Sequence, residues 1–447
     1  MSARDLLAVY TVPGAGAAAR VAALAARGER ASGDVERRVR AIVDAVRRRG
    51  DAALFAYTRR FDGATVTPRT VEVPAREMAR AEAALAPEVR RALRLAARRI
   101  EAFHRRQRQR SWSFRDATGA VLGQQVRALD RVGVYVPGGT AAYPSSVLMN
   151  VIPAKVAGVG EIVGVTPAGR GGIPAPVLAA ARIAGIDRLF RVGGAQAIAA
   201  LAYGTRSVPR VDKICGPGNV WVATAKRLVF GTVDIDMIAG PSEVLIVADG
   251  AATPALVAAD LLAQAEHDPL AAAILVTPSR ALVGRVQVEL AAQLARLPRR
   301  AIARRALRRQ GTAFVTRSLT AAVALANRLA PEHLELAVRR PKRLLPAIRH
   351  AGAIFLGEHA PEAFGDYLAG PNHILPTGGS ARFSSPLGVY DFVKRSSVIG
   401  ASARTLARLG PAVATLARLE GLDAHAVAVT ARLRYNAGRL RGKDRRR

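Results

Sequence analysis

Short apolar runs alternate with Ala-rich stretches of helical periodicity over most of the chain after Arg131. They form two successive series of predicted strands, 131–136, 161–166, 188–192 and 211–215, and then 242–249, 271–278, 312–317, 331–338 and 351–357. A predicted helix separates most neighbouring strands. This alternation is typical of parallel strands joined by crossover helices. The sequence therefore predicts an α/β fold with two Rossmann-like, parallel-rich sheets.

The rest of the chain completes a four-part organisation. We expect an N-terminal helical segment at 1–31 and mostly helical structure over 32–110. The first α/β domain is predicted from 32–130 plus 241–380, and the second from 131–240. A long loop at 365–392 then leads into a small helical C-terminal domain, within 381–447. Loops of this length in a compact protein are usually functional.

One predicted helix, with Thr253 as its N-cap, carries an apolar stripe that ends in polar side chains. Val257 and Leu261 are followed on the same face by Gln264 and His267. A buried Gln or His is most often satisfied by a backbone carbonyl or an ordered water. The alternative is a ligand at the helix end, and this helix alone leaves both open.

Three predicted strand-to-helix corners contain glycine, at 136–146, 192–201 and 215–227. Glycine lets the backbone approach a ligand closely, and helix N-termini offer N–H groups to anionic phosphates. No G-x-G-x-x-G motif occurs in the chain, and glycine at such corners also serves ordinary turns. The corners are therefore compatible with nucleotide binding and with simple turn chemistry.

The formal net charge of +33 would ordinarily suggest a polyanionic partner. All but six of the 67 basic residues are Arg, however, and they are scattered over Ala-rich helices. Only the helix at 89–110 and the tail at 439–447, which is predicted to be disordered, are locally dense. We therefore expect solvated helix faces and no specific nucleic-acid binding.

The single cysteine, Cys215, excludes an internal disulfide framework and fits a reducing compartment. No apolar run approaches the ~18 residues that span a bilayer. Asp5, Pro13 and Gly14 interrupt an N-terminus that otherwise resembles a signal peptide. We expect a cytoplasmic protein without a membrane partner.

Candidate chemistry collects at predicted element ends and in the long loop. Glu332 and His333 lie at a helix-to-strand corner, where a general base could face a cleft. Asp366 lies in the loop and His425 at the head of the last helix. Each is individually explained as surface chemistry. Together with Gln264 and His267 they form a mixed nitrogen and oxygen set suited to a divalent ion such as Zn²⁺.

Several long stretches resemble the histidinol dehydrogenase family, over about residues 32–435. They are "VYVPGGTAAYPSSVLMNVIPAKVAGV", "GGAQAIAALAYGT", "KICGPGNVWVATAKRLV", "DMIAGPSEVLIVAD", "LLAQAEHDP", "APEHLEL", "GDYLAGPNHILPTGG" and "EGLDAHAVAV". The resemblance implies an aldehyde-dehydrogenase-like pair of α/β domains. It also implies a homodimer with shared active sites, whose C-terminal domain serves dimerisation.

The resemblance further implies roles for individual residues. The implied zinc ligands are Gln264, His267, Asp366 and, from the other subunit, His425. The implied acid/base residues are Glu332 and His333. The implied substrate contacts are Ser242, Gln264, His267, His333, Asp366, Glu420 and His425. The implied NAD contacts are Tyr135, Gln196 and Asn219.

The activity that the resemblance implies is oxidation of L-histidinol to L-histidine through a bound aldehyde, the last step of histidine biosynthesis. It would use one Zn²⁺ per subunit and two NAD⁺. Cys215 lies beside a predicted cofactor corner and invites interpretation as a nucleophile, which this activity does not need. Two other classes stay open on the residues alone, a metal-dependent hydrolase and a basic nucleic-acid-binding module.

Overall fold

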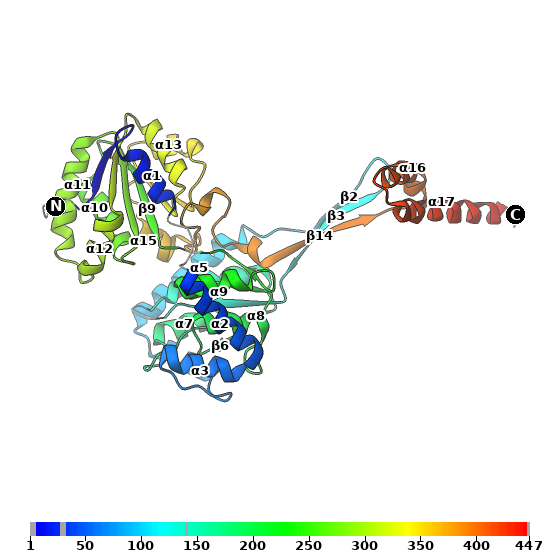
Figure 1. Cartoon of the computed structure of the whole chain (residues 1–447), viewed down its shortest axis with the longest axis horizontal. Coiled ribbons are helices and arrows are strands. Elements are labelled where there is room, and N and C mark those ends of the chain that lie inside the picture. Colours follow the sequence, from blue (N-terminus) through cyan, green and yellow to red (C-terminus); the bar gives the residue numbers. More distant parts are fainter. Residues whose placement is uncertain (1–5, 27–32, 139–141, 239, 445–447) are drawn as a thin grey trace. The chain divides into compact units, whose positions relative to one another are not determined.

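The computed structural model describes residues 6–26, 33–138, 142–238 and 240–444. It divides into two compact units. The first unit is Met1–Gln107 with Leu129–Phe392, and the second is Arg108–Ala128 with Val393–Arg447. The first unit contains two parallel sheets, and the second contains an antiparallel sheet and two helices (Figure 1).

A six-stranded parallel sheet forms one half of the first unit, in the order β1-β11-β10-β9-β12-β13. Its strands are β1 (Ala8–Thr11), β9 (Glu243–Ala248), β10 (Ala272–Thr277), β11 (Thr312–Val315), β12 (His333–Ala337) and β13 (Ala353–Leu356). Three of the four inner strands, β9, β10 and β12, are buried throughout, because helices cover both faces of the sheet. The second predicted series of strands is confirmed.

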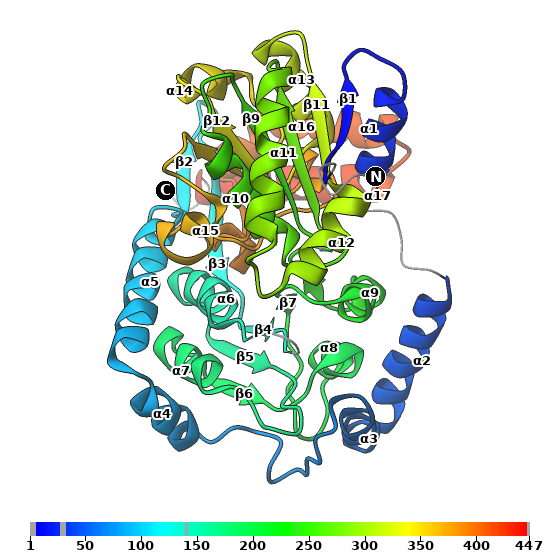
Figure 2. The same ribbon diagram turned by 90° about the vertical axis from the view of Figure 1, so that its left-hand side faces the viewer.

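Alternate residues of these strands point into two different cores. Val244 and Ile246 of β9 pack with α10 (Pro254–Ala265), α11 (Arg280–Leu294) and α12 (Arg300–Gln310). Leu245 and Val247 pack on the other side with α1 (Ala17–Ala25) and α13 (Leu319–Leu329). Figure 2 shows α10, α11 and α12 together on one face of this sheet.

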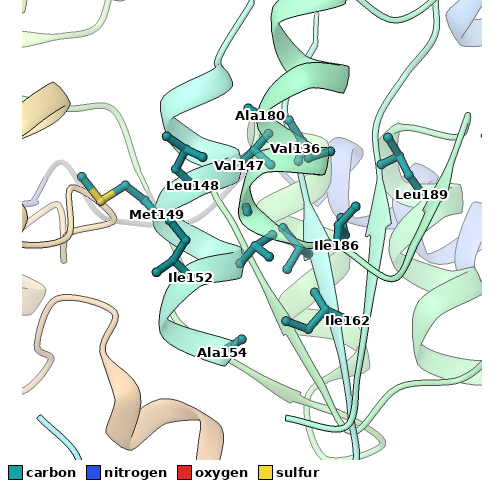
Figure 3. Packing of buried hydrophobic residues seen from close by; sticks show 14 of the residues in the cluster. Val136, Val147, Leu148, Met149, Ile152, Ala154, Ile162, Ala180, Ile186 and Leu189 are labelled. Atoms are coloured by element: carbon teal, nitrogen blue, oxygen red, sulfur yellow. The ribbon is translucent and has the colours of Figure 1, made fainter. Parts of the chain in front are cut away.

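A five-stranded sheet forms the other half of the first unit, in the order β6-β5-β4-β7-β8. Its strands are β4 (Arg131–Tyr135), β5 (Glu161–Val165), β6 (Arg188–Phe190), β7 (Lys213–Cys215) and β8 (Asp234–Ile235), all parallel. One face packs against α6 (Pro144–Ala157) and α7 (Ala175–Ala184) through the apolar residues drawn in Figure 3. The other face packs against α8 (Gly194–Tyr203) and α9 (Val220–Val229). The predicted α/β fold class is confirmed, while the finer comparison with aldehyde dehydrogenases stays a prediction.

The helices of the N-terminal third pack mainly with the other predicted domain. The four helices α2 (Gly33–Arg49), α3 (Asp51–Asp62), α4 (Ala75–Ala84) and α5 (Pro87–Arg105) pack mainly on helices of the five-stranded sheet, although α5 also contacts residues 365–369. The described part of the predicted segment 1–31 is not separate either, because β1 pairs with β11 in the six-stranded sheet. An amphipathic helix shows in its sequence that it has a buried face, but not which sheet covers that face.

Short helical segments connect the sheets and the loop. They are α14 (Pro341–Leu344), η2 (Leu345–Ala347), α15 (Glu362–Phe364), the π-helix η3 (Gly365–Ala369), η4 (Ser380–Arg382) and η5 (Val389–Phe392). The loop predicted at 365–392 is therefore partly helical. Its first part, α15 with η3, packs near α10 and α5.

The second unit is built on a strand that the apolar pattern did not predict. β14 (Val393–Gly400) pairs antiparallel with β3 (Val121–Ala128), which pairs with β2 (Trp112–Arg115). Helices α16 (Ala403–Leu419) and α17 (Asp423–Asp444) follow. The expected disorder of the basic tail is wrong as far as Asp444, because α17 continues to that residue; 445–447 lie outside the described residues. Over the described residues, no helix has the length and apolar character needed to cross a membrane.

Candidate active site

The predicted acid–base pair lies where β9 and β12 begin. These neighbouring parallel strands start at the same edge of the sheet, with His333 opposite Val244. The backbone N–H of Glu243 donates to Oε2 of Glu332 at 2.9 Å, and the N–H of Glu332 donates to Oε1 of Glu243 at 3.2 Å. This reciprocal pair fixes the carboxylate of Glu332 at the amino edge of the sheet. Both side chains are buried.

The imidazole of His333 is surrounded by acidic groups. Its Nδ1 lies 3.2 Å from the carbonyl oxygen of Glu243, 3.7 Å from Oε1 of Glu362 and 3.8 Å from Oε2 of Glu332. Its Nε2 lies 3.7 Å from Oδ1 of Asp366 and, within the described chain, is buried without a hydrogen-bond partner. This ring nitrogen therefore keeps an unused hydrogen-bonding position among the described residues.

Burial and charge act in opposite directions on these groups. Burial lowers the pKa of His333, but the carboxylates of Glu362, Glu332 and Asp366 outweigh it and raise that pKa well above its usual value. Burial also raises the pKa of Glu332 to about 7 and that of Glu362 to about 8, against the lowering effect of His333. Glu332 is thus poised for proton transfer near neutral pH.

A group of possible metal ligands adjoins this pair. One ligand atom each of His267, Glu362 and Asp366 lies within 4.8 Å of the other two. Gln264, fully buried in the last turn of α10, contacts Glu362. A helix C-terminus carries partial negative charge and favours a cation. Imidazole, carboxylate and carboxamide donors together suit Zn²⁺.

The structure refines the predicted polar stripe on α10. Val257, Leu261 and Gln264 are buried as expected, but α10 ends at Ala265 and His267 lies in the following turn, with an exposed side chain. Thr253 is the N-cap residue, as predicted, but its side chain makes no hydrogen bond to the helix. Its hydroxyl donates to Glu358.

Three further site residues have different outcomes. Ser242, a predicted substrate contact, directly precedes β9 at the edge where Glu332 lies. Glu362 was not predicted as a site residue, although its position four residues before Asp366 placed it within one helical turn. No role was predicted for His373, whose Nδ1 lies 2.9 Å from the carbonyl oxygen of Asp366 and whose Nε2 lies 3.4 Å from Oγ of Ser146.

The predicted cofactor residues line one cavity of about 770 Å³. Tyr135, Gln196 and Asn219 all border it, together with Asp62 from the end of α3. Gln196 is 1% exposed, and its Nε2 has no hydrogen-bond partner among the described residues. Such an unsatisfied buried donor in a cavity of this size fits a polar ligand.

The glycine corners supply fewer free N–H groups than expected. The N–H of Gly193 donates to Asp62 and that of Gly194 to the hydroxyl of Tyr135, each at 3.2 Å. At the head of α9, Oδ1 of Asn219 accepts from the backbone N–H groups of Trp221 and Val222. Side chains therefore occupy much of both helix N-termini. Gly139 of the first corner lies outside the described residues.

Two remaining expectations concern Cys215 and the second unit. Cys215 is fully buried, and burial raises the pKa of its thiol well above the usual value, which opposes its use as a thiolate nucleophile. Glu420 at the end of α16 and His425 in the first turn of α17 belong to the second unit. Both are exposed, whereas the other predicted site residues belong to the first unit.

The fold and the site together indicate the class of protein. A buried acid–imidazole pair beside side chains that could hold a cation, on a two-sheet α/β frame, is the arrangement of an enzyme that moves protons at a bound substrate. A family model for histidinol dehydrogenase matches residues 25–433, and the chain belongs to this family. It is an oxidoreductase that acts on a CH–OH group, as the resemblance implied.

Comparison with individual proteins agrees over nearly the whole chain. The chain is 60% identical over 416 residues to the histidinol dehydrogenase of Syntrophotalea carbinolica, covering 93% of this chain and 96% of that protein. It is 54% identical over 409 residues to that of Aquifex aeolicus, covering 92% and 95%. The crystal structure of histidinol dehydrogenase from Elizabethkingia anophelis superimposes with a TM-score of 0.91 at 35% identity, covering 97% of this chain and 99% of that one.

Proposed function

We propose that the protein oxidises L-histidinol to L-histidine through a bound aldehyde, with two NAD⁺ consumed, as the last step of histidine biosynthesis in the cytoplasm. The overall change removes two hydrides and takes one oxygen from water. The observation that carries this proposal is the buried Glu332–His333 pair, placed beside the cluster of His267, Glu362 and Asp366. The relatives' printed names support the choice of substrate.

The residues assigned to Zn²⁺ are Gln264, His267, Asp366 and His425 of the partner subunit. The described donors fit the ion by their chemistry and by the 4.8 Å grouping of His267 with Asp366. When bound, the ion supplies a positive charge that orients the amine and imidazole nitrogens of the substrate. A cation there also counteracts the carboxylates that raise the pKa of His333.

His333 and Glu332 divide the proton transfers between them. Nε2 of His333 takes the hydroxyl proton of the substrate in each hydride transfer, which is consistent with its buried, unpartnered position in the described chain. Glu332 takes a proton from the water that adds to the aldehyde, because its carboxylate is held at the sheet edge with a pKa of about 7. Ser242 and the partner's Glu420 are assigned as substrate contacts.

The residues assigned to NAD⁺ are Tyr135, Gln196 and Asn219, which border the 770 Å³ cavity. When bound, the dinucleotide supplies the hydride acceptor. Gln196 contributes a buried carboxamide nitrogen without another partner among the described residues. A hydrolase would need the Glu–His pair and the metal, but no cavity with such a donor.

A homodimer with shared sites is part of the same proposal. The second unit has a small buried cluster of Ala414, Ala417 and Ala426 and exposes large apolar side chains on the same two helices. Leu419 is 81% exposed and Val427 is 61% exposed. Apolar surface of this kind is typical of an interface with another chain.

The test is absorbance at 340 nm after adding NAD⁺ and L-histidinol. The wild-type chain should form two NADH per histidinol and yield L-histidine. The Glu332→Gln variant keeps the fold but lacks the base for water addition, so aldehyde oxidation should fall at least tenfold more than the first hydride transfer. No NADH from the wild-type chain would contradict the function, and equal losses in the two half-reactions would contradict the role of Glu332.

A further inference from the structure

Glu362 is a buried carboxylate that none of the assigned roles uses. It begins α15 and is 3% exposed. Its backbone N–H donates to Oε1 of Glu335 at 2.9 Å, which ties the start of α15 to strand β12. This anchor holds the Glu362 side chain in the space between Gln264 and His333.

The contact with Gln264 has a definite polarity. The nitrogen and oxygen of a carboxamide are assigned from the surrounding hydrogen bonds. With the nitrogen of Gln264 turned to Glu362, it donates to both carboxylate oxygens, at 3.1 and 3.2 Å. The opposite orientation would place the amide oxygen against two carboxylate oxygens. The two contacts with Glu362 therefore favour one of the two orientations of the amide.

The selected orientation matters for a metal. With its nitrogen committed to Glu362, the carboxamide of Gln264 keeps its oxygen for another partner. An amide oxygen has lone pairs that bind a cation, whereas the amide nitrogen carries two hydrogens and does not. His267 and Asp366, the neighbouring ligands, group with Glu362 itself within 4.8 Å.

We propose that Glu362 is a positioning residue, which holds the amide of Gln264 so that its oxygen, and not its nitrogen, is presented to the Zn²⁺ bound by His267 and Asp366. This inference rests on the proposed zinc site. Glu362 acts through Gln264 and is not itself a ligand in this assignment. Partners of this kind typically contribute 10–100-fold to metal affinity.

The experiment measures zinc affinity of the purified full chain by competition with a chromophoric chelator. Glu362→Gln is nearly isosteric and keeps the buried volume, but its neutral amide accepts either orientation of Gln264. We expect zinc to bind about tenfold or more weakly. Glu335→Gln is the matched control, because it makes the same change in a neighbouring buried carboxylate that contacts the backbone of Glu362. It should leave zinc affinity within about threefold of wild type.

A double variant separates positioning from direct action on the metal. If Glu362 acts through Gln264, Glu362→Gln should have almost no further effect on zinc affinity in the Gln264→Ala background. If Glu362 is a ligand, or acts through its own charge, the loss persists there and the inference is wrong. The visible spectrum of the Co²⁺-loaded chain gives a second readout. It should change in Glu362→Gln and stay unchanged in Glu335→Gln.

The two proposals fail in different ways. A wild-type chain that takes up no zinc contradicts the proposed metal site, and the inference about Glu362 is then wrong as well. A wild-type chain with one zinc per subunit, together with a Glu362→Gln variant that binds zinc equally tightly, contradicts the inference alone.

Discussion

Several buried or half-buried carboxylates in this protein are held by backbone N–H groups. Glu332 accepts from the N–H of Glu243, Glu335 from that of Glu362, and Asp62 from that of Gly193. A backbone donor fixes a carboxylate in place without neutralising its charge. The desolvation cost of burial therefore stays visible in raised pKa values.

Asp62 allows this to be tested away from the proposed metal. Burial raises its pKa to about 6, against the lowering effect of the Gly193 N–H. A carboxyl whose pKa is higher in the folded than in the unfolded chain contributes stability that is fully present below about pH 4 and is lost as pH rises through about 6. Asp62→Asn cannot ionise and keeps an acceptor for Gly193. The melting temperature of Asp62→Asn minus that of wild type should therefore be about 1–3 °C larger at pH 7.5 than at pH 4.

Thermal unfolding of both chains at several pH values gives this difference directly. Asp34→Asn removes an exposed carboxylate in the first turn of α2, which pairs with Arg37, and should show no such gain. A constant offset between Asp62→Asn and wild type across the pH range would contradict the argument.

At the scale of elements, the corner between β7 and α9 is held by a buried ion pair. Nζ of Lys226 donates to the carbonyl oxygen of Gly216 at 3.0 Å, and Asp236 accepts from the N–H of Gly216 at 2.8 Å. Lys226 and Asp236 also contact each other, and both side chains are almost fully buried. Both backbone polar groups of Gly216 are thus hydrogen-bonded, and Gly216 lies close to Tyr135, which borders the cavity.

Gly216→Ala should disrupt this corner. A Cβ at Gly216 would lie 2.1 Å from the carbonyl oxygen of Tyr135, and the φ of +113° is one that side chains rarely adopt. Relief requires Tyr135 to move, so we expect NAD⁺ affinity to fall about tenfold or more and the free energy of unfolding to fall by about 3 kcal/mol. Isothermal titration with NAD⁺ and denaturant unfolding measure the two effects.

Gly231→Ala is the matched control for backbone strain. Gly231 also has a positive φ, +95°, but no described atom lies within 4 Å of its Cβ position. It should lose about 1 kcal/mol of stability and keep its NAD⁺ affinity. Equal effects of the two substitutions would show that the close approach to Tyr135 is unimportant.

The elements that could be predicted are those with continuous apolar runs. Strands such as β5 and β10 are buried on both faces, so their sequence shows them directly. β2 and β14 were missed because most of their residues are exposed and lack such a run. The same distinction holds in the site. Glu332 and His333 stand out as an adjacent pair, whereas the contact of Glu362 with Gln264 exists only once α15 packs near α10.

At the scale of the whole molecule, the sequence indicated the two parallel sheets, but neither the third, antiparallel sheet nor the grouping of helices around the sheets. Val39 and Leu54 pack in the core under α8, although their segment was assigned to the other sheet. The apolar face of an amphipathic helix can pack against either sheet, so its sequence does not show which sheet it covers. The same applies to His425. Its exposed place on α17 does not show whether it joins the active site of its own chain or that of the partner subunit.

Mixed dimers decide which chain His425 serves. If each site combines His333 of one subunit with the partner's His425, the variants His333→Ala and His425→Ala should each be inactive alone. When they are unfolded, mixed and refolded, a heterodimer collects both lesions in one site and none in the other. Random pairing makes half of the dimers heterodimers with one intact site, so activity should return to about a quarter of wild type.

A second mixture supplies the control. Glu332 and His333 lie in the same unit of one chain, so refolding Glu332→Gln with His333→Ala leaves one lesion in every site and should restore no activity. Heterodimers can be confirmed by tagging the two variants differently and purifying on both tags in turn. Doubly tagged dimers of His333→Ala and His425→Ala should then show about half of the wild-type rate, since one site in two is intact. If those dimers stay inactive, each site takes both histidines from a single chain, and the shared-site assignment of His425 is wrong.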